Sequence, residues 1–334
     1  MLILPGQETA REILAVHGVM IMGISWFIGG PFLYIAVVVF LYKTVLTVWG
    51  YITMPRHLRW DIYPVPHQGR IGSKYQQVDF TGLKPPVFFM DELKEMLQEM
   101  LFIKRAWVNN PRVWKGSFPL HMGFYFGFAW IVLIAIGAVF ELNGLPVAAA
   151  APLWGRLLFY LTLAAGSIGF AAGLGGSLVL LWLRTTDEDM RYMSDYVSYI
   201  NLGLMILLFG SGLAALLFAD PSFAVDRAHM AGLLTLRPAA VKEPLLLFRM
   251  LIFGLFLLYL PFNRMMHFVG KYFFYHDIMW DDASMKRGSA METDVAAYLN
   301  YRVTWSGAHV RQGESWLDQV AGEASREEDQ NEKE

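Results

Sequence analysis

Residues 118–142 read FPLHMGFYFGFAWIVLIAIGAVFEL, an apolar run in which Glu141 is the one residue with a full charge. About 20 apolar residues in helical conformation are enough to cross the hydrocarbon core of a bilayer. The stretch therefore predicts a transmembrane helix, in which every backbone polar group is satisfied within the segment. His121 stands in the first turn of this predicted helix. Ionisable groups are costly at that depth, so His121 is a candidate functional residue.

Four further stretches are equally apolar, and together they predict an all-α integral membrane protein built as a five-span helical bundle. The predicted spans are 25–50, 118–142, 153–183, 196–219 and 245–270. Pro119, Pro152 and Pro244 each stand at a predicted helix start, where a missing N–H is harmless. The apolar residues 13–23 precede Gly29-Gly30-Pro31. They are read as an interfacial or re-entrant helix, or as an extension of the first span.

The composition agrees with a membrane protein and limits its redox chemistry. Of 334 residues, 55% are hydrophobic and 17% are charged, whereas about a quarter are charged in soluble domains. Because the chain has no cysteine, it holds no disulfide, no covalently attached c-type haem and no cysteine-ligated iron–sulfur cluster. Glu8, Arg11 and Glu12 precede the first apolar segment. This is not the basic start of a signal peptide, so we expect the segment to be retained.

The distribution of Lys and Arg orients the predicted bundle. One such residue precedes the first span, ten lie in 52–116, and seven follow His267, whereas 143–152 has none and 220–244 has three. Basic loops face the cytoplasm, so we expect the N-terminus outside and the C-terminus inside. His121 then enters the membrane from the cytoplasmic side, and His267 closes the fifth span on that same side.

His121 and His267 are therefore predicted at one depth, near the inner surface. Two neutral imidazoles on different helices are good axial ligands for the iron of one b-type haem. Gly123 and Gly127, close behind His121, would let a macrocycle lie against the backbone. The alternative is that each histidine is an interfacial side chain that bonds water or a backbone carbonyl.

Three motifs in 117–275 carry a resemblance to a known family. They are the sequence His121-Met122-Gly123, the sequence GGSLVLLWLR at 175–184 followed by Asp195-Tyr196, and the sequence PFNRMMH at 261–267. In this order they resemble the gamma subunit of respiratory nitrate reductase, a membrane di-haem cytochrome b. The chain is even more similar to the related cytochrome b subunits of sulfite-reductase-linked and other transmembrane redox complexes of sulfate reducers.

The resemblance implies one haem that is ligated by His121 and His267. This chain differs from the family at the ligands of the second haem. That haem uses a histidine ten residues after the first ligand and another eighteen before the last, where this chain has Ile131 and Arg249. The resemblance therefore implies only the inner haem for this chain. His17 and His229 lie on the outer side in the predicted topology. Each is either a substitute ligand for a second haem or a solvated loop histidine.

Two arginines are candidate cofactor-binding residues. Arg249 lies about one turn inside an apolar helix, where it either contacts a haem propionate or a quinone carbonyl, or serves structure by reaching the outer headgroups or pairing with Glu141. Arg264 and Lys271 flank His267 and suit the propionates of an inner haem. Basic residues at a cytoplasmic helix end are also common without any such role.

The remaining segments are expected outside the bilayer: 1–24 as an outer or interfacial segment, 51–117 as a cytoplasmic partner-docking loop, and 271–334 as a cytoplasmic tail after the core 118–270. Residues 91–107 have the apolar spacing of an amphipathic helix, which either lies on the membrane or docks a partner. The acidic tail from Glu314 onward is expected to be disordered when unbound. His57, His67 and His276 are read as surface or partner-contact residues, and no nucleic-acid patch is present.

These features lead to the expectation of a membrane cytochrome b subunit in the cytoplasmic (inner) membrane. It would transfer electrons through haem b between the quinone pool, menaquinone by the resemblance, and a cytoplasmic iron–sulfur partner. It would complete no enzyme reaction alone, but would work with other subunits as a quinone oxidoreductase complex. With one haem, an inner or mid-depth quinone site is expected. A haem-free membrane anchor and a di-haem version stay open, and a transporter is less expected because no repeat is evident.

Overall fold

A computed structural model describes residues 20, 22–54, 88–280 and 287–321. Within these residues the chain is helical, and the β-structure described there consists of two isolated bridges. Five helices are long and apolar enough to cross a membrane, which confirms the predicted all-α, multi-pass character. They are Met22–Thr53, Pro111–Leu142, Leu153–Thr186, Tyr196–Phe218 and Pro244–Phe262.

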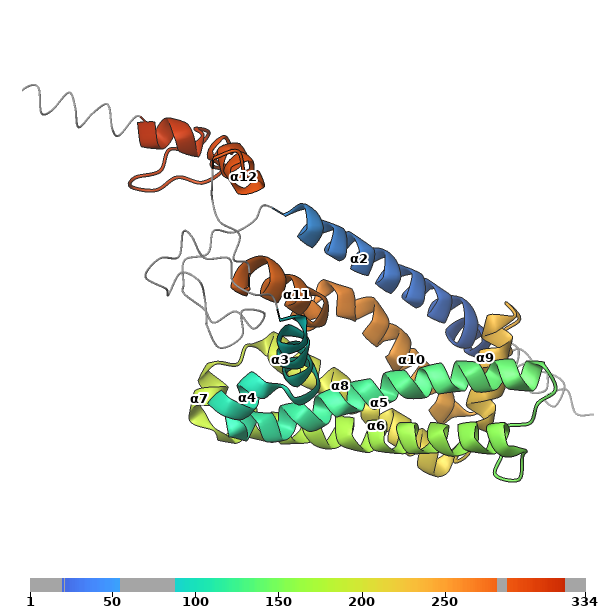
Figure 1. Cartoon of the computed structure of the whole chain (residues 1–334). Coiled ribbons are helices and arrows are strands. Elements are labelled where there is room, and N and C mark those ends of the chain that lie inside the picture. Colours follow the sequence, from blue (N-terminus) through green and yellow to red (C-terminus); the bar gives the residue numbers. More distant parts are fainter. Residues whose placement is uncertain (1–19, 21, 55–87, 281–286, 322–334) are drawn as a thin grey trace, which may run out of the picture. The chain divides into compact units, whose positions relative to one another are not determined.

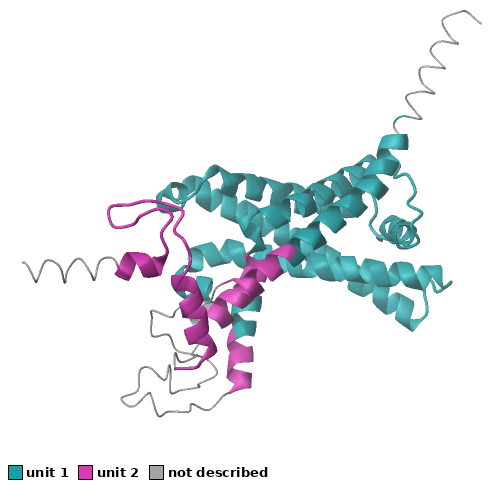
Figure 2. Ribbon diagram, turned by 90° about the horizontal axis from the view of Figure 1, so that it is seen from above, with its two compact units in different colours: residues 1–45, 96–266 teal, residues 46–95, 267–334 magenta. Residues whose placement is uncertain are grey.

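Contacts divide the chain into two compact units (Figure 2), and each is described here by itself. Unit 1 is Met1–Val45 with Met96–Met266, and unit 2 is Leu46–Glu95 with His267–Glu334. In chain order the helical elements are η1 (Ile28–Phe32), α2 (Leu33–Thr53), α3 (Phe89–Phe102), α4 (Lys104–Asn109), α5 (Pro111–Leu142), α6 (Leu153–Thr186), α7 (Glu188–Tyr192), α8 (Tyr196–Phe218), α9 (Ala224–Leu234), α10 (Pro244–Tyr259), η4 (Leu260–Phe262), η5 (Arg264–Met266), α11 (His267–Phe273), η6 (Phe274–Met279) and α12 (Ala290–Leu299).

The first span is one continuous helix that starts slightly before the predicted residue 25. Gly29-Gly30-Pro31 does not interrupt it, because these residues form the π-helical turn η1. A π turn accommodates a residue that cannot fit the regular ladder, and proline inside a helix lacks the N–H that the ladder needs. The residues of 13–23 that precede Met22 fall, except for Met20, outside the described part of the chain.

The second span starts earlier than predicted. The Asn110 side chain caps α5 by accepting a hydrogen bond from the Val113 N–H at 3.2 Å, and Pro111 follows as the first helical residue. Pro119 therefore lies inside α5, so the prediction that it starts the helix was wrong. His121 lies about three turns into α5 instead of in its first turn. Pro152 and Pro244 do stand at helix starts, directly before α6 and as the first residue of α10.

Helices α5 and α6 lie side by side (Figure 1) because glycines remove the side chains between them. A Cβ added at Gly123 would clash with the Gly173 Cα, and one at Gly176 would clash with the Leu120 backbone. Small residues of this kind allow close approach of helices in membranes. Helix packing thus explains Gly173 and Gly176 in the glycine-rich run at 173–176.

The fifth span is shorter than predicted. Helix α10 gives way to the 3₁₀ turn η4, Asn263 is extended with φ −121° and ψ 158°, and a second 3₁₀ turn follows. His267 is the first residue of α11. The prediction of one helix over 245–270 that ends with His267 in its last turn was therefore wrong, because Pro261 and the extended Asn263 interrupt the helix first.

The predicted amphipathic helix 91–107 is two helices. Ile103 has a positive φ of 52° and separates α3 from α4. Two side chains of α5 bond the carbonyls at the end of α3: the Trp114 Nε1–H donates to the Phe102 carbonyl at 2.7 Å, and the Tyr125 hydroxyl donates to the Met100 carbonyl. These bonds satisfy carbonyls that a helix end leaves without partners.

The apolar core of unit 1 lies between α5, α6, α8 and α10, with Ile134, Phe170, Met205, Phe209 and Phe256 among its buried members. The spans also present large apolar side chains outward, as expected of helices in contact with lipid; examples are Val38, Phe128 and Trp154.

The part of the tail that the structure describes contains regular local structure. In unit 2, α12 is followed by an antiparallel bridge between Arg302 and Ser315, and residues 316–321 are helical. The Ser315 hydroxyl accepts a hydrogen bond from the Asp318 N–H at 3.1 Å and so caps this last turn. The expectation of disorder from Glu314 onward in the unbound chain stays a prediction. Residues 322–334 lie outside the described chain.

Candidate functional site

His121 projects from α5 with its ring held by the preceding turn. Its Nδ1 lies 2.7 Å from the Ser117 carbonyl oxygen and 3.4 Å from the Ser117 hydroxyl. A carbonyl only accepts hydrogen bonds, so Nδ1 carries the proton and Nε2 carries the lone pair in the neutral ring. This is the tautomer of a histidine that binds a metal through Nε2, with the other ring nitrogen bonded to a backbone carbonyl.

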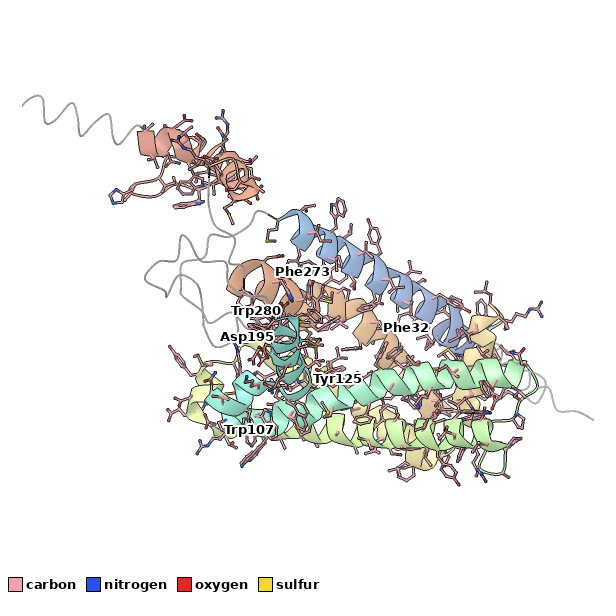
Figure 3. The ribbon with its side chains drawn as sticks, viewed as in Figure 1. Phe32, Trp107, Tyr125, Asp195, Phe273 and Trp280 are labelled. Carbon is pink, nitrogen blue, oxygen red and sulfur yellow. The ribbon has the colours of Figure 1, made fainter. Side chains whose placement is uncertain are left out.

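Two aromatic side chains lie close to His121 in the sequence of α5. Tyr125, labelled in Figure 3, lies one turn further along α5 with its ring centroid 6.5 Å from that of His121. Phe124 faces the core, where it contacts Phe209 at 5.1 Å and stacks on Phe256 at 5.8 Å between ring centroids. Partly buried His121 therefore lies next to an aromatic layer that joins α5, α8 and α10.

The two glycines after His121 differ in the space beside them. Gly123 faces the α6 backbone at Gly173, so it serves helix packing and leaves no slot for a macrocycle on that side. The prediction that Gly123 lets a macrocycle lie against the backbone was therefore wrong. A Cβ added at Gly127 would meet nothing within 4 Å, so the surface of α5 beside Gly127 remains compatible with a flat ligand.

His267 begins α11 and is exposed within unit 2. One turn on, Gly270 lies against Tyr51 of α2, and the Tyr51 ring stacks on Phe273 at 5.3 Å. These contacts anchor α11 to the end of α2. His121 belongs to unit 1 and His267 belongs to unit 2. Each histidine is therefore positioned by contacts within its own unit.

Arg264 forms an exposed ion pair with Asp195, which is labelled in Figure 3. Asp195 also caps α8, accepting hydrogen bonds from the Ser198 N–H at 2.9 Å and the Ser198 hydroxyl at 2.8 Å. These two bonds, followed by Arg264, lower the pKa of Asp195 to about 2. Arg264 thus has an ionised carboxylate partner within the chain, while its side chain is 61% exposed.

Arg249 is buried and forms a bidentate ion pair with Asp226 of α9, with its Nη1 2.9 Å from Asp226 Oδ2. Its guanidinium carbon also lies 5.3 Å from the centroid of the Trp130 ring. The structural interpretation of Arg249 as an ion-pair partner agrees with this geometry, but the partner is not Glu141. Glu141 instead accepts from Arg227 Nε at 2.9 Å.

Helix α9 carries the rest of this buried polar network. Arg227 donates to the Ser222 carbonyl at 2.9 Å and to the Val147 carbonyl at 3.0 Å. The ring of His229 donates from Nε2 to the Gly29 carbonyl at 2.7 Å. Burial is the main cause that lowers the pKa of His229. The α9 network is therefore formed by Asp226, Arg227, His229, Arg249 and Glu141.

The α9 network bears on the alternative that the chain binds a second haem. Ile131 follows Trp130 on α5, and Arg249 is engaged by Asp226. His229 already uses Nε2 to bond a backbone carbonyl, so it functions here as a buried connection between α9 and η1. His17, His57 and His67 lie outside the described residues.

His276 is part of a contact within unit 2. Its Nε2 lies 2.8 Å from a carboxylate oxygen of Glu92 in α3, and its Nδ1 lies 2.8 Å from the Tyr272 carbonyl. The ring also stacks on Tyr272. His276 therefore connects η6 to the start of α3, a structural role that its isolated position in the sequence did not indicate.

The structure also reveals polar residues that the sequence reading missed. Asn201 of α8 and Asn263 exchange amide hydrogen bonds of 2.9 and 3.2 Å, and the Tyr259 hydroxyl donates to Asn201 Oδ1 at 2.9 Å. One signal was available: an asparagine stands inside the otherwise apolar run 196–218. Its partner Asn263, between η4 and η5, becomes evident only once the helices are packed.

No known protein family, no curated protein and no solved structure matches the chain. Among the described residues, no group of three or more His, Asp or Glu side chains is arranged to hold a metal ion.

Proposed function

We propose that the chain is a membrane cytochrome b subunit that transfers electrons between the menaquinone pool and a cytoplasmic iron–sulfur subunit. His121 and His267 are the proposed axial ligands of one haem b. The observation that carries the proposal is the hydrogen bond between His121 Nδ1 and the Ser117 carbonyl, which directs the ligating lone pair to Nε2 in an apolar span. The motif resemblance supports His267 as the second ligand.

A bound haem b supplies a one-electron iron couple between a two-electron quinol and a one-electron cluster. The chain's residues position this chemistry and separate it from water. Ser117 orients the His121 ring, and the aromatic side chains Phe124, Phe209 and Phe256 exclude water next to it. Arg264 is the proposed contact for the propionates, with Asp195 holding the guanidinium in place between such contacts.

The proposal includes a location and an orientation. The five apolar helices support a multi-pass membrane protein, and the basic residues of 52–116 favour an N-out, C-in arrangement in the cytoplasmic membrane. In this orientation α3 and α4 face the cytoplasm. Exposed Phe102, Trp107 and Val108 there offer an apolar surface for the iron–sulfur subunit.

Arg249 is not part of the proposed haem site. Its buried pair with Asp226 supports a structural role, and the α9 network supports a stoichiometry of one haem per chain. A second haem would need ligands that the network now uses for packing.

The test is a visible spectrum of the purified chain. Reduction by dithionite is expected to give a b-type alpha band with about one haem per protein, and both His121→Ala and His267→Ala are expected to abolish it. His309→Ala is the matched control, because His309 is exposed and lies beyond α12. A wild-type chain without an alpha band would refute the proposal and favour a haem-free membrane anchor. Full haem content in either ligand variant would refute that ligand.

A further inference from the structure

Asn201, Tyr259 and Asn263 form a polar cluster between α8 and the end of α10, within an otherwise apolar bundle. The three side chains are partly buried and are connected by three hydrogen bonds. Uncharged polar groups in a membrane span generally face the bundle interior and bond across helices. We call these three residues the amide cluster.

The break in the fifth span creates the cluster. Pro261 ends the regular ladder, and the extended backbone at Asn263 turns the chain before η5. The Asn263 Oδ1 accepts a hydrogen bond from the Met265 N–H at 3.2 Å, which stabilises this turn locally. A continuous helix would not hold the Asn263 amide in this turn. The break therefore presents an amide to Asn201 of α8.

The aromatic layer of Phe124, Phe209 and Phe256 gives the depth of the cluster relative to His121. His121 precedes Phe124 by three residues on α5, and Tyr259 follows Phe256 by three residues on the antiparallel α10. At a rise of about 1.5 Å per residue, both lie roughly 4.5 Å from the layer toward the same end of unit 1. His121 and the amide cluster are therefore at similar depth in one bundle.

The cluster has hydrogen-bonding capacity beyond its internal bonds. Each asparagine amide carries two N–H groups, and the bonds within the described residues use one from each. Lys43 of α2 adds a positive charge nearby, since its Nζ lies 5.7 Å from the centroid of the Phe262 ring, directly before Asn263. The break thus carries two amides and a phenol that bond to one another, and the residue before Asn263 has an ammonium group over its ring.

We infer that the amide cluster, with Lys43, is the site at which the chain binds the ring carbonyl of a quinone. Carbonyl oxygens accept from amide and ammonium N–H groups, the flat ring stacks on aromatic side chains, and an isoprenoid tail stays in the lipid that surrounds the spans. This inference rests on the proposed function and specifies it, because it assigns the quinone to the same end of the bundle as His121. Electrons would then pass over a short distance without crossing the membrane.

The test is binding of a quinone analogue, 2-heptyl-4-hydroxyquinoline N-oxide, to the purified full chain, followed by its fluorescence. Asn201→Leu and Tyr259→Phe are expected to raise the dissociation constant about tenfold or more, because each removes donors or disturbs their orientation. Lys43→Met is expected to weaken binding in the same direction. The haem spectrum of each variant is recorded in parallel and is expected to remain unchanged.

Tyr199→Phe is the matched control. Tyr199 lies on α8 near Asn201, but its hydroxyl donates to the Arg184 carbonyl at 2.9 Å, outside the cluster. Its loss is expected to leave analogue binding unaltered. Because Asn201→Leu removes all three internal bonds and can prevent folding, Tyr259→Phe, which removes one hydroxyl, keeps the inference testable.

The two possible failures are distinguishable. Wild-type affinity in Tyr259→Phe and Lys43→Met, with a normal haem spectrum, would overturn the quinone site and leave the cytochrome proposal standing. A lowered melting temperature of Tyr259→Phe with unchanged affinity would likewise overturn it, since the cluster would then only join α8 to the break. Absence of the alpha band from the wild-type chain would instead refute the proposed function.

Discussion

The two ends of unit 1 hold their charged groups in opposite ways. At the α9 end, Arg249 and Asp226 form an ion pair whose side chains are 7% and 4% exposed. At the other end, where α5 begins, the same residue types form the pair of Arg264 and Asp195, with side chains 61% and 46% exposed. One pair is inside the protein, whereas the other is at its surface.

The difference shows which end is built for rigidity. At the α9 end, the buried charged side chains Asp220, Asp226, Arg227 and Arg249 bond to other charged side chains or to backbone groups, which a low-dielectric interior requires. The end with His121 has a broken helix, an uncharged amide cluster and a histidine with a defined tautomer. Ligand exchange is more compatible with the second arrangement, because neutral hydrogen bonds hold its amide cluster.

Breaking the buried ion pair is expected to have the largest effect on stability. Asp226→Ala leaves the Arg249 guanidinium buried without its carboxylate, so we expect a loss of about 3–5 kcal/mol in the free energy of unfolding. Thermal or denaturant unfolding in detergent micelles measures it. Combining Asp226→Ala with Arg249→Met is expected to restore much of the loss, because no unpaired buried charge remains.

Removing one partner of the surface ion pair tests whether burial distinguishes the two ends. Arg264→Met is expected to cost far less than Asp226→Ala, since exposed ion pairs contribute little and are screened by salt. Equal losses for the two variants would show that burial does not distinguish the two ends.

Glycine packing between α5 and α6 gives the second largest expected effect. Gly123→Ala forces a methyl group against the Gly173 backbone, so we expect a loss of about 1–3 kcal/mol in unfolding free energy. Gly127→Ala, one turn away on the same helix, meets nothing within 4 Å and is expected to be neutral or slightly stabilising. Similar melting temperatures of the two variants would contradict this account of the packing.

His229 is expected to make the stability of the α9 end depend on pH. Burial lowers its pKa below 6.5 in the folded chain, so protons bind the unfolded chain more readily. The stability is therefore greatest above pH 6.5 and falls as the pH drops from 6.5 through the lower folded pKa. Unfolding measured between pH 8 and 5 in wild type and His229→Gln checks this. A wild-type slope that persists fully in the variant would exclude His229 as its source.

The smallest effect is expected at Asp195. Its pKa is lowered from 3.8 to about 2, so its contribution to stability is complete above pH 3.8 and is lost as the pH falls toward 2. Asp195→Asn keeps an oxygen that can cap α8 but removes the charge, and it is expected to reduce this acid-dependent loss. A pH titration by NMR of the labelled carboxyl in detergent measures the pKa, and an ordinary value would refute the capping account.

Sequence alone determined the five helices, because a run of about 20 apolar residues has few alternatives to a membrane helix. It misplaced helix ends: Pro119 is tolerated inside α5, and Asn263 interrupts the fifth span before His267. Local signals such as one proline do not reveal whether neighbouring helices satisfy the groups that it frees.

Only the tertiary structure decided the partners of the polar side chains. Arg249 pairs with Asp226 instead of Glu141, and Asn201 meets Asn263 across 62 positions of sequence. Apolarity is a property of each residue along the chain, so it can be read in order. A hydrogen bond or an ion pair needs two groups in one place with the correct direction, and packing of the helices alone provides that.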